Sequence, residues 1–360
     1  MTSRNGSAWR RNAVFGVVLL SLALAVPAGT LRQDEDAGRP APLDALLEKL
    51  ASFEYGPDDG ALFELRSYVR SRRNDPRAIE ACESAFLAFL AGEASPAAKQ
   101  AVCRELGLIG TDRSVPVLER MLVIEGTSDM ARYGLEGIPG MAADMALLRG
   151  LSVLRGDARL GVVSSLGNRR CAAAVPALER LLRSSDGTEA GAAAEALGRI
   201  GGPEATRALA AAFAKVPAGV RERAVAALLA SAEGLLARGD ASGALTAFDR
   251  VLATGPTRAL RRAAFRGKVA AAGPGGKGLV LGALGGKPPN LVQPAIEMIP
   301  VILDTATISV AAALLPRLHE EGQVQLVAAL ASFPKESVLG TLTKASDSPL
   351  AAVRVEALRA

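Results

Sequence analysis

Few side chains in this sequence are of the types that carry out catalysis or bind metals. His319 is the only histidine, so a hydrolase triad or a zinc site would have to use it. No second or third partner stands at a suitable spacing. His319 follows Arg317-Leu318 and precedes Glu320 and Glu321, which favours a solvated helix terminus. The sequence therefore predicts no catalytic residue and no metal site.

The three cysteines, Cys82, Cys103 and Cys171, are the next candidates for chemistry. All three stand among apolar residues, where free cysteine packs as a small hydrophobic side chain. We expect burial without bonding, with a Cys82–Cys103 disulfide as the alternative because these two lie on neighbouring predicted helices. No Cys-x-x-Cys-His motif occurs, which excludes covalent c-type haem. We expect no cofactor.

Two glycine-rich segments resemble phosphate-binding loops only superficially. In Gly273–Gly278, Ala271 stands at the position of the leading glycine, and Gly278 stands where Ser or Thr would contact magnesium. No predicted strand precedes this segment, and Gly286-Lys287-Pro288 departs from the pattern in the same way. Both segments are predicted to be turns between helices.

Five basic residues recur near the starts of predicted helices and are candidate contacts for a partner. In a helical array one set of helices lines the concave face, and a ladder of basic residues there would attract acidic ligands. Pairing with acidic residues of the turns, or simple solvation, is the alternative. These residues are Lys99, Arg132, Arg159, Arg221 and Arg261.

A repeat predicts the helices that carry these residues. Leu166 is followed twelve positions later by Leu178, and Leu197 by Leu209. A short turn separates the two leucines of each pair. First members are separated by about 28 to 33 residues, as in two-helix repeats, so roughly eight or nine units are expected. The remaining pairs are Leu106 with Leu118, Leu135 with Leu147, Leu236 with Phe248, Val269 with Leu281, Ile302 with Leu314, and Leu330 with Leu342.

Within each unit the apolar residues recur at three- and four-residue spacing, which makes an apolar stripe on a helix. Pro116 and Pro176 stand where second helices begin, a position at which the missing N–H costs nothing. No convincing alternation typical of strands occurs. The sequence thus predicts an all-α chain of helix pairs, each of which needs its neighbours to bury its stripe.

The pairs share a motif over residues 105–122, 165–182 and 196–213. An Arg-x-x-Ala-type first helix ends at Leu-Gly, and Val-Pro-x-Leu-x-x-Leu-Leu forms the second helix. The motif resembles the HEAT-like repeats of the phycobilisome-lyase type, over about residues 95–360. Segments Lys99–Leu106 and Ser128–Tyr133 resemble exported bacterial HEAT-repeat proteins. This resemblance implies a right-handed α-solenoid (HEAT/armadillo-type superhelix) of two-helix repeats, and it is specific for fold, not activity.

The N-terminus predicts export. Basic residues precede an apolar run from Ala13 to Val26, and Val26-Pro27-Ala28 supplies the small residues of a cleavage site. We expect a signal peptide over residues 1–28, a flexible linker over 29–42, capping helices over 43–94 and the repeat array over 95–360.

Within the array, residues 232–256 resemble one tetratricopeptide hairpin, with a lengthened HEAT unit as the alternative of equal local geometry. The apolar run over residues 305–315 is expected to form a buried helix. Leu358 occupies the first position of a further repeat, so the array is expected to continue beyond Ala360.

The charge of the chain bears on its partners. The formal net charge is +5; without Arg4, Arg10 and Arg11 of the leader, it is 5 − 3 = +2. This weak charge, with the only tryptophan at Trp9, argues against nucleic acid and against a HEAT-like DNA glycosylase, which needs a basic groove and aromatic side chains.

We therefore expect a non-catalytic protein-interaction scaffold in the periplasm or outside the cell, with no transmembrane segment after signal cleavage. Its partner would be a protein or a further domain of a longer chain. The alternative is an enzyme-associated module related to the bilin-lyase-type HEAT proteins.

Overall fold

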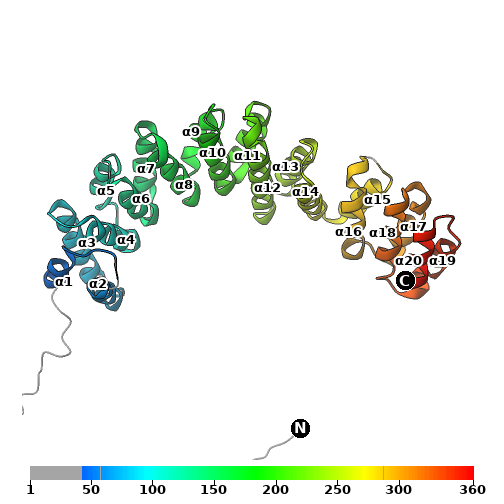
Figure 1. The fold of residues 1–360 in the computed structure, drawn as a ribbon, viewed down its shortest axis with the longest axis horizontal. Helices are drawn as coiled ribbons and strands as arrows, with labels where there is room; N and C mark the ends of the chain where they lie inside the picture. The colour runs from blue at the N-terminus through cyan, green and yellow to red at the C-terminus, as the bar shows by residue number, and fades with distance from the viewer. Residues whose placement is uncertain (1–42, 57, 287) are drawn as a thin grey trace, which may run out of the picture. The chain divides into compact units, whose positions relative to one another are not determined.

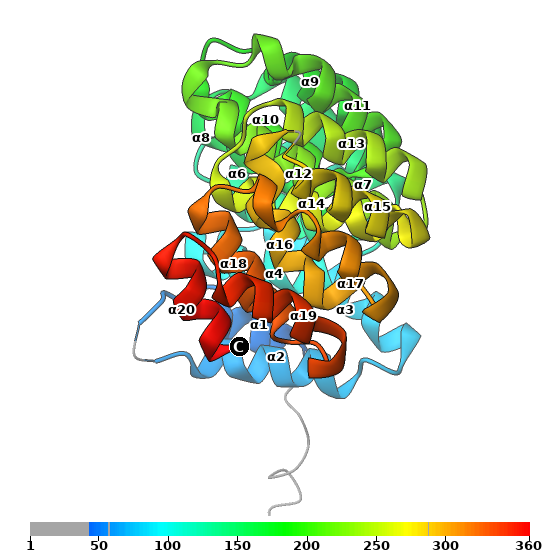
Figure 2. The same cartoon turned by 90° about the vertical axis from the view of Figure 1, so that its right-hand side faces the viewer.

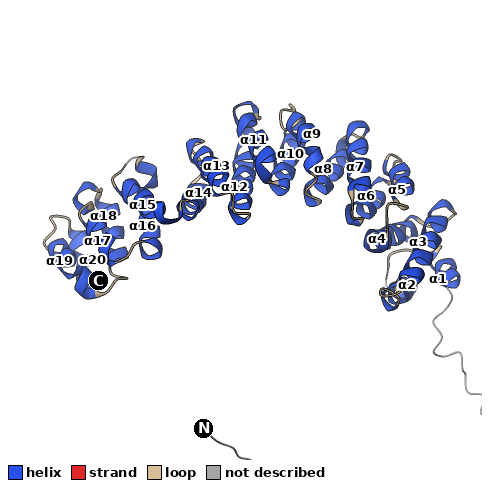
Figure 3. Ribbon diagram, turned by 180° about the vertical axis from the view of Figure 1, so that it is seen from behind, coloured by secondary structure: helices blue, strands red, loops and turns tan. Residues whose placement is uncertain are grey.

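The computed structural model describes residues 43–56, 58–286 and 288–360. These residues form helices joined by short loops, and no strand occurs among them (Figure 3). The chain over these residues is an all-α repeat solenoid, which confirms the predicted fold class. The predicted signal peptide (1–28) and linker (29–42) lie outside the described residues.

Three helices begin the described chain. They are α1 (Leu43–Leu50), α2 (Gly60–Ser71) and α3 (Pro76–Ala91). Helix α3 starts as its sequence dictates, because Pro76 occupies the first turn and the Asp75 carboxylate accepts hydrogen bonds from two backbone N–H groups of that turn. Helix α3 then packs on α4, which joins these helices to the repeats.

The repeats are built from two rows of helices. In the even row each helix packs on the next even-numbered one, and the odd row lies on the other side of the array (Figures 1 and 2). The even row comprises α4 (Pro96–Ile109), α6 (Ser128–Gly137), α8 (Gly156–Asn168), α10 (Gly187–Ile200), α12 (Arg221–Ala237), α14 (Arg258–Ala271), α16 (Val292–Ile302), α18 (Glu320–Leu330) and α20 (Ala351–Arg359). The odd row comprises α5 (Val115–Leu122), α7 (Met141–Val153), α9 (Val175–Leu181), α11 (Gly202–Ala212), α13 (Ala241–Ala253), α15 (Gly276–Leu284), α17 (Thr305–Ala312) and α19 (Lys335–Ser346).

Short 3-10 helices occupy several connections between the rows. They are η1 (Ala172–Ala174), η2 (Phe213–Lys215), η3 (Ala218–Val220), η4 (Gly273–Gly275), η5 (Pro289–Leu291) and η6 (Leu315–Arg317). Gly273–Gly275 therefore lie in an inter-helix turn, as predicted, whereas Gly276–Gly278 form the first turn of α15.

The predicted register of apolar pairs holds best in the first four repeats. All eight residues of the first four predicted pairs are buried, seven of them completely. They are Leu106, Leu118, Leu135, Leu147, Leu166, Leu178, Leu197 and Leu209. Other predicted positions that are buried are Phe248, Val269, Leu330 and Leu342. The first four repeats thus form a continuous core from side chains at the expected positions.

From α12 onward the register holds at only half of the eight predicted positions. The predicted positions that are only half-buried are Leu236, Leu281, Ile302 and Leu314. The buried positions near them are Leu235, Val280, Ile299 and Leu315. Helix α12 has 17 residues, against 14 in α10 and in α14. Because each residue turns the helix by about 100°, a change in helix length brings a neighbouring position to the core.

Glycines let helices of the even row approach closely. A Cβ atom on Gly137 of α6 would lie 2.1 Å from the carbonyl oxygen of Gly107 in α4. One on Gly167 of α8 would lie 2.8 Å from the Cα of Ala196 in α10. These separations are shorter than non-bonded carbon atoms tolerate, so no other residue fits there without moving the helices apart.

The glycine of the Leu-Gly motif was predicted to end its helix, and this is wrong. Helix α8 continues past Gly167 to Asn168, and α10 continues past Gly198 to Ile200. Gly201, with a φ of +62°, follows the end of α10. The motif glycine instead allows neighbouring helices to pack closely. It lies inside its helix and does not end it.

The helix α17 also differs from expectation. Only Ile308 and Ala311 are buried along it, and Val310 is half exposed. A helix of the odd row has one face on the core and one in solvent, so most of the apolar run over 305–315 forms a helix that is buried on one face only. None of the helices described is long and apolar enough to cross a membrane.

The core divides into two clusters of buried side chains that meet at α14. Ala264 and Ala271 of α14 belong to the N-terminal cluster, which extends back to Leu47. Phe265 and Val269 of the same helix belong to the C-terminal cluster. Helix α14 is thus the element that both clusters share.

Candidate binding groove between α11 and α13

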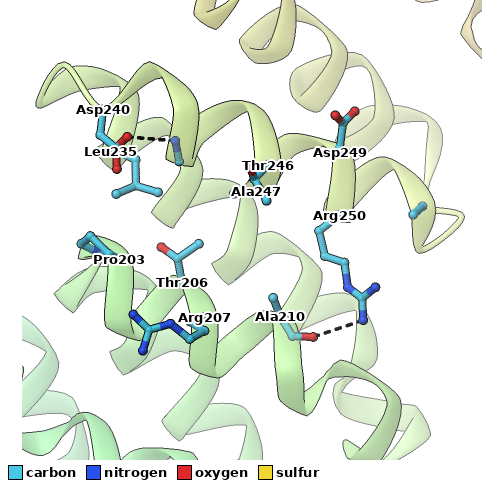
Figure 4. Close-up of a pocket in the computed structure, with 12 residues that line it drawn as sticks. Pro203, Thr206, Arg207, Ala210, Leu235, Asp240, Thr246, Ala247, Asp249 and Arg250 are labelled. Carbon is cyan, nitrogen blue, oxygen red and sulfur yellow. Dashed lines mark hydrogen bonds between the residues drawn. The ribbon is translucent and has the colours of Figure 1, made fainter.

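A groove of about 590 Å³ lies between α11 and α13, two successive helices of the odd row (Figure 4). Thr206, Arg207 and Ala210 line it from α11, and Thr246 and Ala247 line it from α13. Its walls are mainly apolar. The groove therefore offers a contact surface for an apolar side chain or a short stretch of polypeptide.

Small residues at helical spacing explain the hollow. On α13, Thr246 and Ala247 follow Gly243 by three and four residues, so all three lie toward one face of the helix. Pro203, Thr206 and Ala210 follow the same rule near and along α11. Side chains this short leave the space between two helices unfilled.

The floor of the groove has its polar groups satisfied. The Thr206 hydroxyl lies 2.7 Å from the Gly202 carbonyl oxygen and 2.5 Å from the Ser231 hydroxyl of α12. Thr206 and Ser231 are both buried. Because these hydroxyls are already hydrogen-bonded to each other, the floor favours apolar contact over polar recognition.

Charged side chains stand at the rim. The Asp240 carboxylate accepts a hydrogen bond of 2.8 Å from the Gly243 N–H at the start of α13. Arg250 reaches across the groove, its guanidinium 3.5 Å from the Ala210 carbonyl oxygen. Asp249 pairs with Lys268 of α14 at 2.5 Å. Asp240 and Asp249 are thus engaged in structure and are not placed as a catalytic carboxylate pair.

Arg207 belongs to two hollows. It also lines a groove of about 460 Å³ between α9 and α11, together with Glu179 and Glu204. Its side chain is exposed and forms no ion pair with any residue the structure describes. The two grooves flank α11 on either side, an arrangement suited to an extended segment that crosses the odd row.

The five predicted partner-contact residues lie elsewhere, along the even row. Lys99 is in α4, Arg132 in α6, Arg159 in α8, Arg221 in α12 and Arg261 in α14. The structure distributes them over five helices and does not bring them into the groove. Their contact with a partner stays a prediction.

Two of these arginines join neighbouring repeats. The Arg132 guanidinium donates to the Ser165 hydroxyl of α8 at 3.0 Å. The Arg159 guanidinium donates to the Glu189 carboxylate of α10 at 2.9 Å. Since each arginine is partly buried, these bonds stabilise the stacking of the even row.

The other three have different surroundings. Arg261 donates to the Pro256 carbonyl oxygen at 2.9 Å and so fixes the loop before α14. The Arg221 guanidinium lies 5.8 Å from the Phe213 ring centroid, within the range of a cation–π contact. Lys99 is half-buried on α4.

The candidate chemical residues are three cysteines and one histidine. Cys82, Cys103 and Cys171 are buried and unbonded, and burial raises the pKa of Cys103 to about 12, which disfavours the nucleophilic thiolate. His319 is exposed at the start of α18. Among the residues described, no group of three or more His, Cys, Asp or Glu side chains could hold a metal ion.

Sequence reasoning did not find the groove. It singled out residues 232–256 for their hairpin pattern, and this hairpin supplies the α13 wall. The signal available was the stripe of small residues on α13 that includes Gly243 and Ala247. Whether such a stripe meets a neighbouring helix or a hollow depends on the separation of α11 and α13, which local sequence does not encode.

Comparison with known proteins bears on the fold of this region. Residues 146–230, which run from α7 into α12, match a family model. That family is HEAT repeats. The HEAT match includes all of α9 and α11, so it covers the walls of the smaller groove and one wall of the larger. The more specific resemblances, to phycobilisome-lyase-type and exported bacterial HEAT proteins, stay predictions.

No curated protein matches the chain. Among solved structures, the chain is similar to an engineered protein known from its crystal structure, with 18% identity and a TM-score of 0.34. The likeness covers 88% of this chain and 97% of that chain.

Proposed function

We propose that this chain is a non-catalytic scaffold that binds protein partners outside the cytoplasm. HEAT repeats commonly serve as protein-interaction scaffolds, and repeat arrays offer extended surfaces to a partner. The observation that carries the proposal is the groove between α11 and α13, which has apolar walls and a floor of satisfied polar groups. Export rests on the predicted signal peptide, and the enzyme-associated alternative stays a prediction.

Site-specific photo-crosslinking tests the proposal. A photoreactive amino acid would replace Thr246, which is exposed in the groove, and as a matched control Ala259, which is exposed on α14 outside the groove. Living cells of the source organism are irradiated and adducts of the tagged chain are identified. We expect a defined protein adduct from position 246 and none from 259.

A second variant fills the groove. Ala210→Phe places a large side chain on the half-buried α11 wall and should abolish the adduct from position 246 while the thermal midpoint stays near that of the parent chain. Equal adducts from both positions, or an adduct that survives Ala210→Phe, would show that the groove does not bind the partner.

A further inference from the structure

A further groove, of about 590 Å³, lies between α2 and α4 and differs chemically from the two grooves that flank α11. Arg66 and Arg70 of α2 and Arg73, two residues past its end, line the groove at intervals of four and three residues, and Arg104 lines it from α4. We call this hollow the arginine groove. Its lining residues are Arg66, Val69, Arg70, Arg73, Arg104, Glu105, Leu108 and Ile109.

Positive charge in the arginine groove exceeds negative charge. Arg66 lies 3.3 Å from the Glu105 carboxylate, the one acid in the lining, and Glu105 is buried beneath it. Arg70, Arg73 and Arg104 are exposed and pair with no acidic side chain of the described chain. Three guanidinium groups therefore keep their donors available for an external acceptor.

Apolar surface lies beside these guanidinium groups. Leu108 is 79% exposed on α4, an unusual exposure for a leucine that borders a groove. Val69 and Ile109 contribute further apolar lining. The half-exposed Tyr55 ring lies 5.9 Å from the Arg104 guanidinium carbon. The groove can thus cover an apolar side chain and hold anionic groups on the same ligand.

We propose that the arginine groove binds an acidic segment of a partner protein, in which carboxylates alternate with apolar side chains. The carboxylates would accept paired hydrogen bonds from Arg70, Arg73 and Arg104, whose planar guanidinium groups match carboxylate geometry. An apolar side chain would cover Leu108. The inference rests on the proposed scaffold function and specifies the chemistry of one partner segment.

The lining favours an acidic polypeptide over a nucleic acid. A nucleic acid requires a continuous path of basic residues for its phosphates, whereas this groove is short and has the Glu105 carboxylate in its lining. Leu108 and Ile109 give a polypeptide side chain a place to bind that a phosphate backbone would not use.

Fluorescence anisotropy with the full chain tests the inference. The probe is a labelled synthetic peptide in which Glu alternates with Leu, and its counterpart carries Gln in place of Glu. We expect the Glu peptide to bind and the Gln peptide to bind at least about tenfold more weakly, since charge-assisted hydrogen bonds are lost. Arg70→Ala and Arg104→Ala should each weaken the Glu peptide about tenfold.

Two further variants sharpen the test. Glu105→Gln removes the carboxylate of the groove and should tighten binding of the Glu peptide. Arg266→Ala removes an exposed arginine of α14, far along the sequence from the groove, and should change neither binding nor the thermal midpoint. Thermal midpoints of the Arg70 and Arg104 variants should also stay unchanged, because both side chains are exposed.

Several results would overturn the inference. These are equal binding of the Glu and Gln peptides, an equal loss in Arg266→Ala, or displacement of the peptide by a single-stranded oligonucleotide at lower concentration. If the peptide fails to bind while the crosslink at position 246 forms, the inference is wrong and the scaffold proposal stands. If the peptide does not bind and the crosslink at position 246 does not form, the inference and the scaffold proposal are both wrong.

Discussion

Single buried polar groups help to hold this array together. Glu83 of α3 is 1% exposed, and its carboxylate accepts hydrogen bonds from the Thr111 N–H at 2.8 Å, the Thr111 hydroxyl at 2.9 Å and the Ser114 hydroxyl at 2.6 Å. It thereby fixes the turn between α4 and α5. Burial raises the pKa of Glu83, but these hydrogen bonds and the nearby Arg113 outweigh burial, so the pKa is lowered overall.

We predict that Glu83→Gln lowers the free energy of unfolding by about 1–3 kcal/mol at neutral pH, because a buried donor set loses its charged acceptor. A lowered folded-state pKa means that the stabilisation is present above the unfolded pKa of about 4.3 and is lost as the pH falls through the folded value. Thermal midpoints of the parent chain and the variant should therefore converge in acid. The exposed Glu80→Gln serves as control and should cost under about 1 kcal/mol. A midpoint difference independent of pH would contradict this role.

Glycine positions allow an equally direct test of close helix packing. Gly137→Ala should destabilise the chain by about 1–3 kcal/mol, because the new Cβ would meet the Gly107 backbone and force α4 and α6 apart. Gly340→Ala is the matched control in the middle of α19, where a Cβ meets nothing within 4 Å. There alanine should stabilise by about 0.5–1 kcal/mol. Chemical denaturation measures both, and effects of the same sign would refute the packing role.

At the scale of the helix, sequence periodicity predicted all the buried positions of the first four pairs but only half of those that follow. Helix pairs and buried leucines were predicted correctly through α11, because each repeat there has nearly the same length. Helix α12 is longer, and near its end the buried residue is Leu235, not Leu236; in α16 it is Ile299, not Ile302. A fixed twelve-residue spacing cannot follow a change in helix length, since the buried face is chosen by the neighbouring helices.

Two isoleucines test which face of α16 is buried in the core. Ile299→Ala should cost about 2–5 kcal/mol, as expected for a completely buried side chain. Ile302→Ala, in the same helix and half-buried, should cost clearly less. Urea unfolding of the two variants compares them directly. The reverse order would restore the register predicted from sequence.

The two grooves show why binding sites were harder to predict than helices. The residue types that line them were visible, but a hollow is a property of the separation between elements. Arg70 and Arg104 stand far apart in sequence and face one groove only because α2 and α4 lie on either side of it. The predicted ladder of basic residues, in contrast, assumed one role for residues that the structure places in unlike surroundings.

For the whole molecule, the location in the cell remains the first prediction to test. We expect the mature protein to begin at or near Gly29 and to be exported, from the basic and apolar pattern that precedes Ala28. N-terminal sequencing of the chain recovered from each cell fraction decides this. Recovery of a chain with intact Met1 from the cytoplasm alone would contradict the export proposal.

The sharing of α14 between two core clusters has a mechanical consequence. Repeats interact only with their neighbours, so a helix whose buried side chains are divided between two clusters is the natural boundary for stepwise unfolding. Under tension along the array, we expect the smaller C-terminal cluster to extend while the N-terminal cluster stays folded, with α14 as the template on which the extended part refolds. The helices that line the grooves contribute to the N-terminal cluster, so extension of the C-terminal cluster would leave the grooves intact.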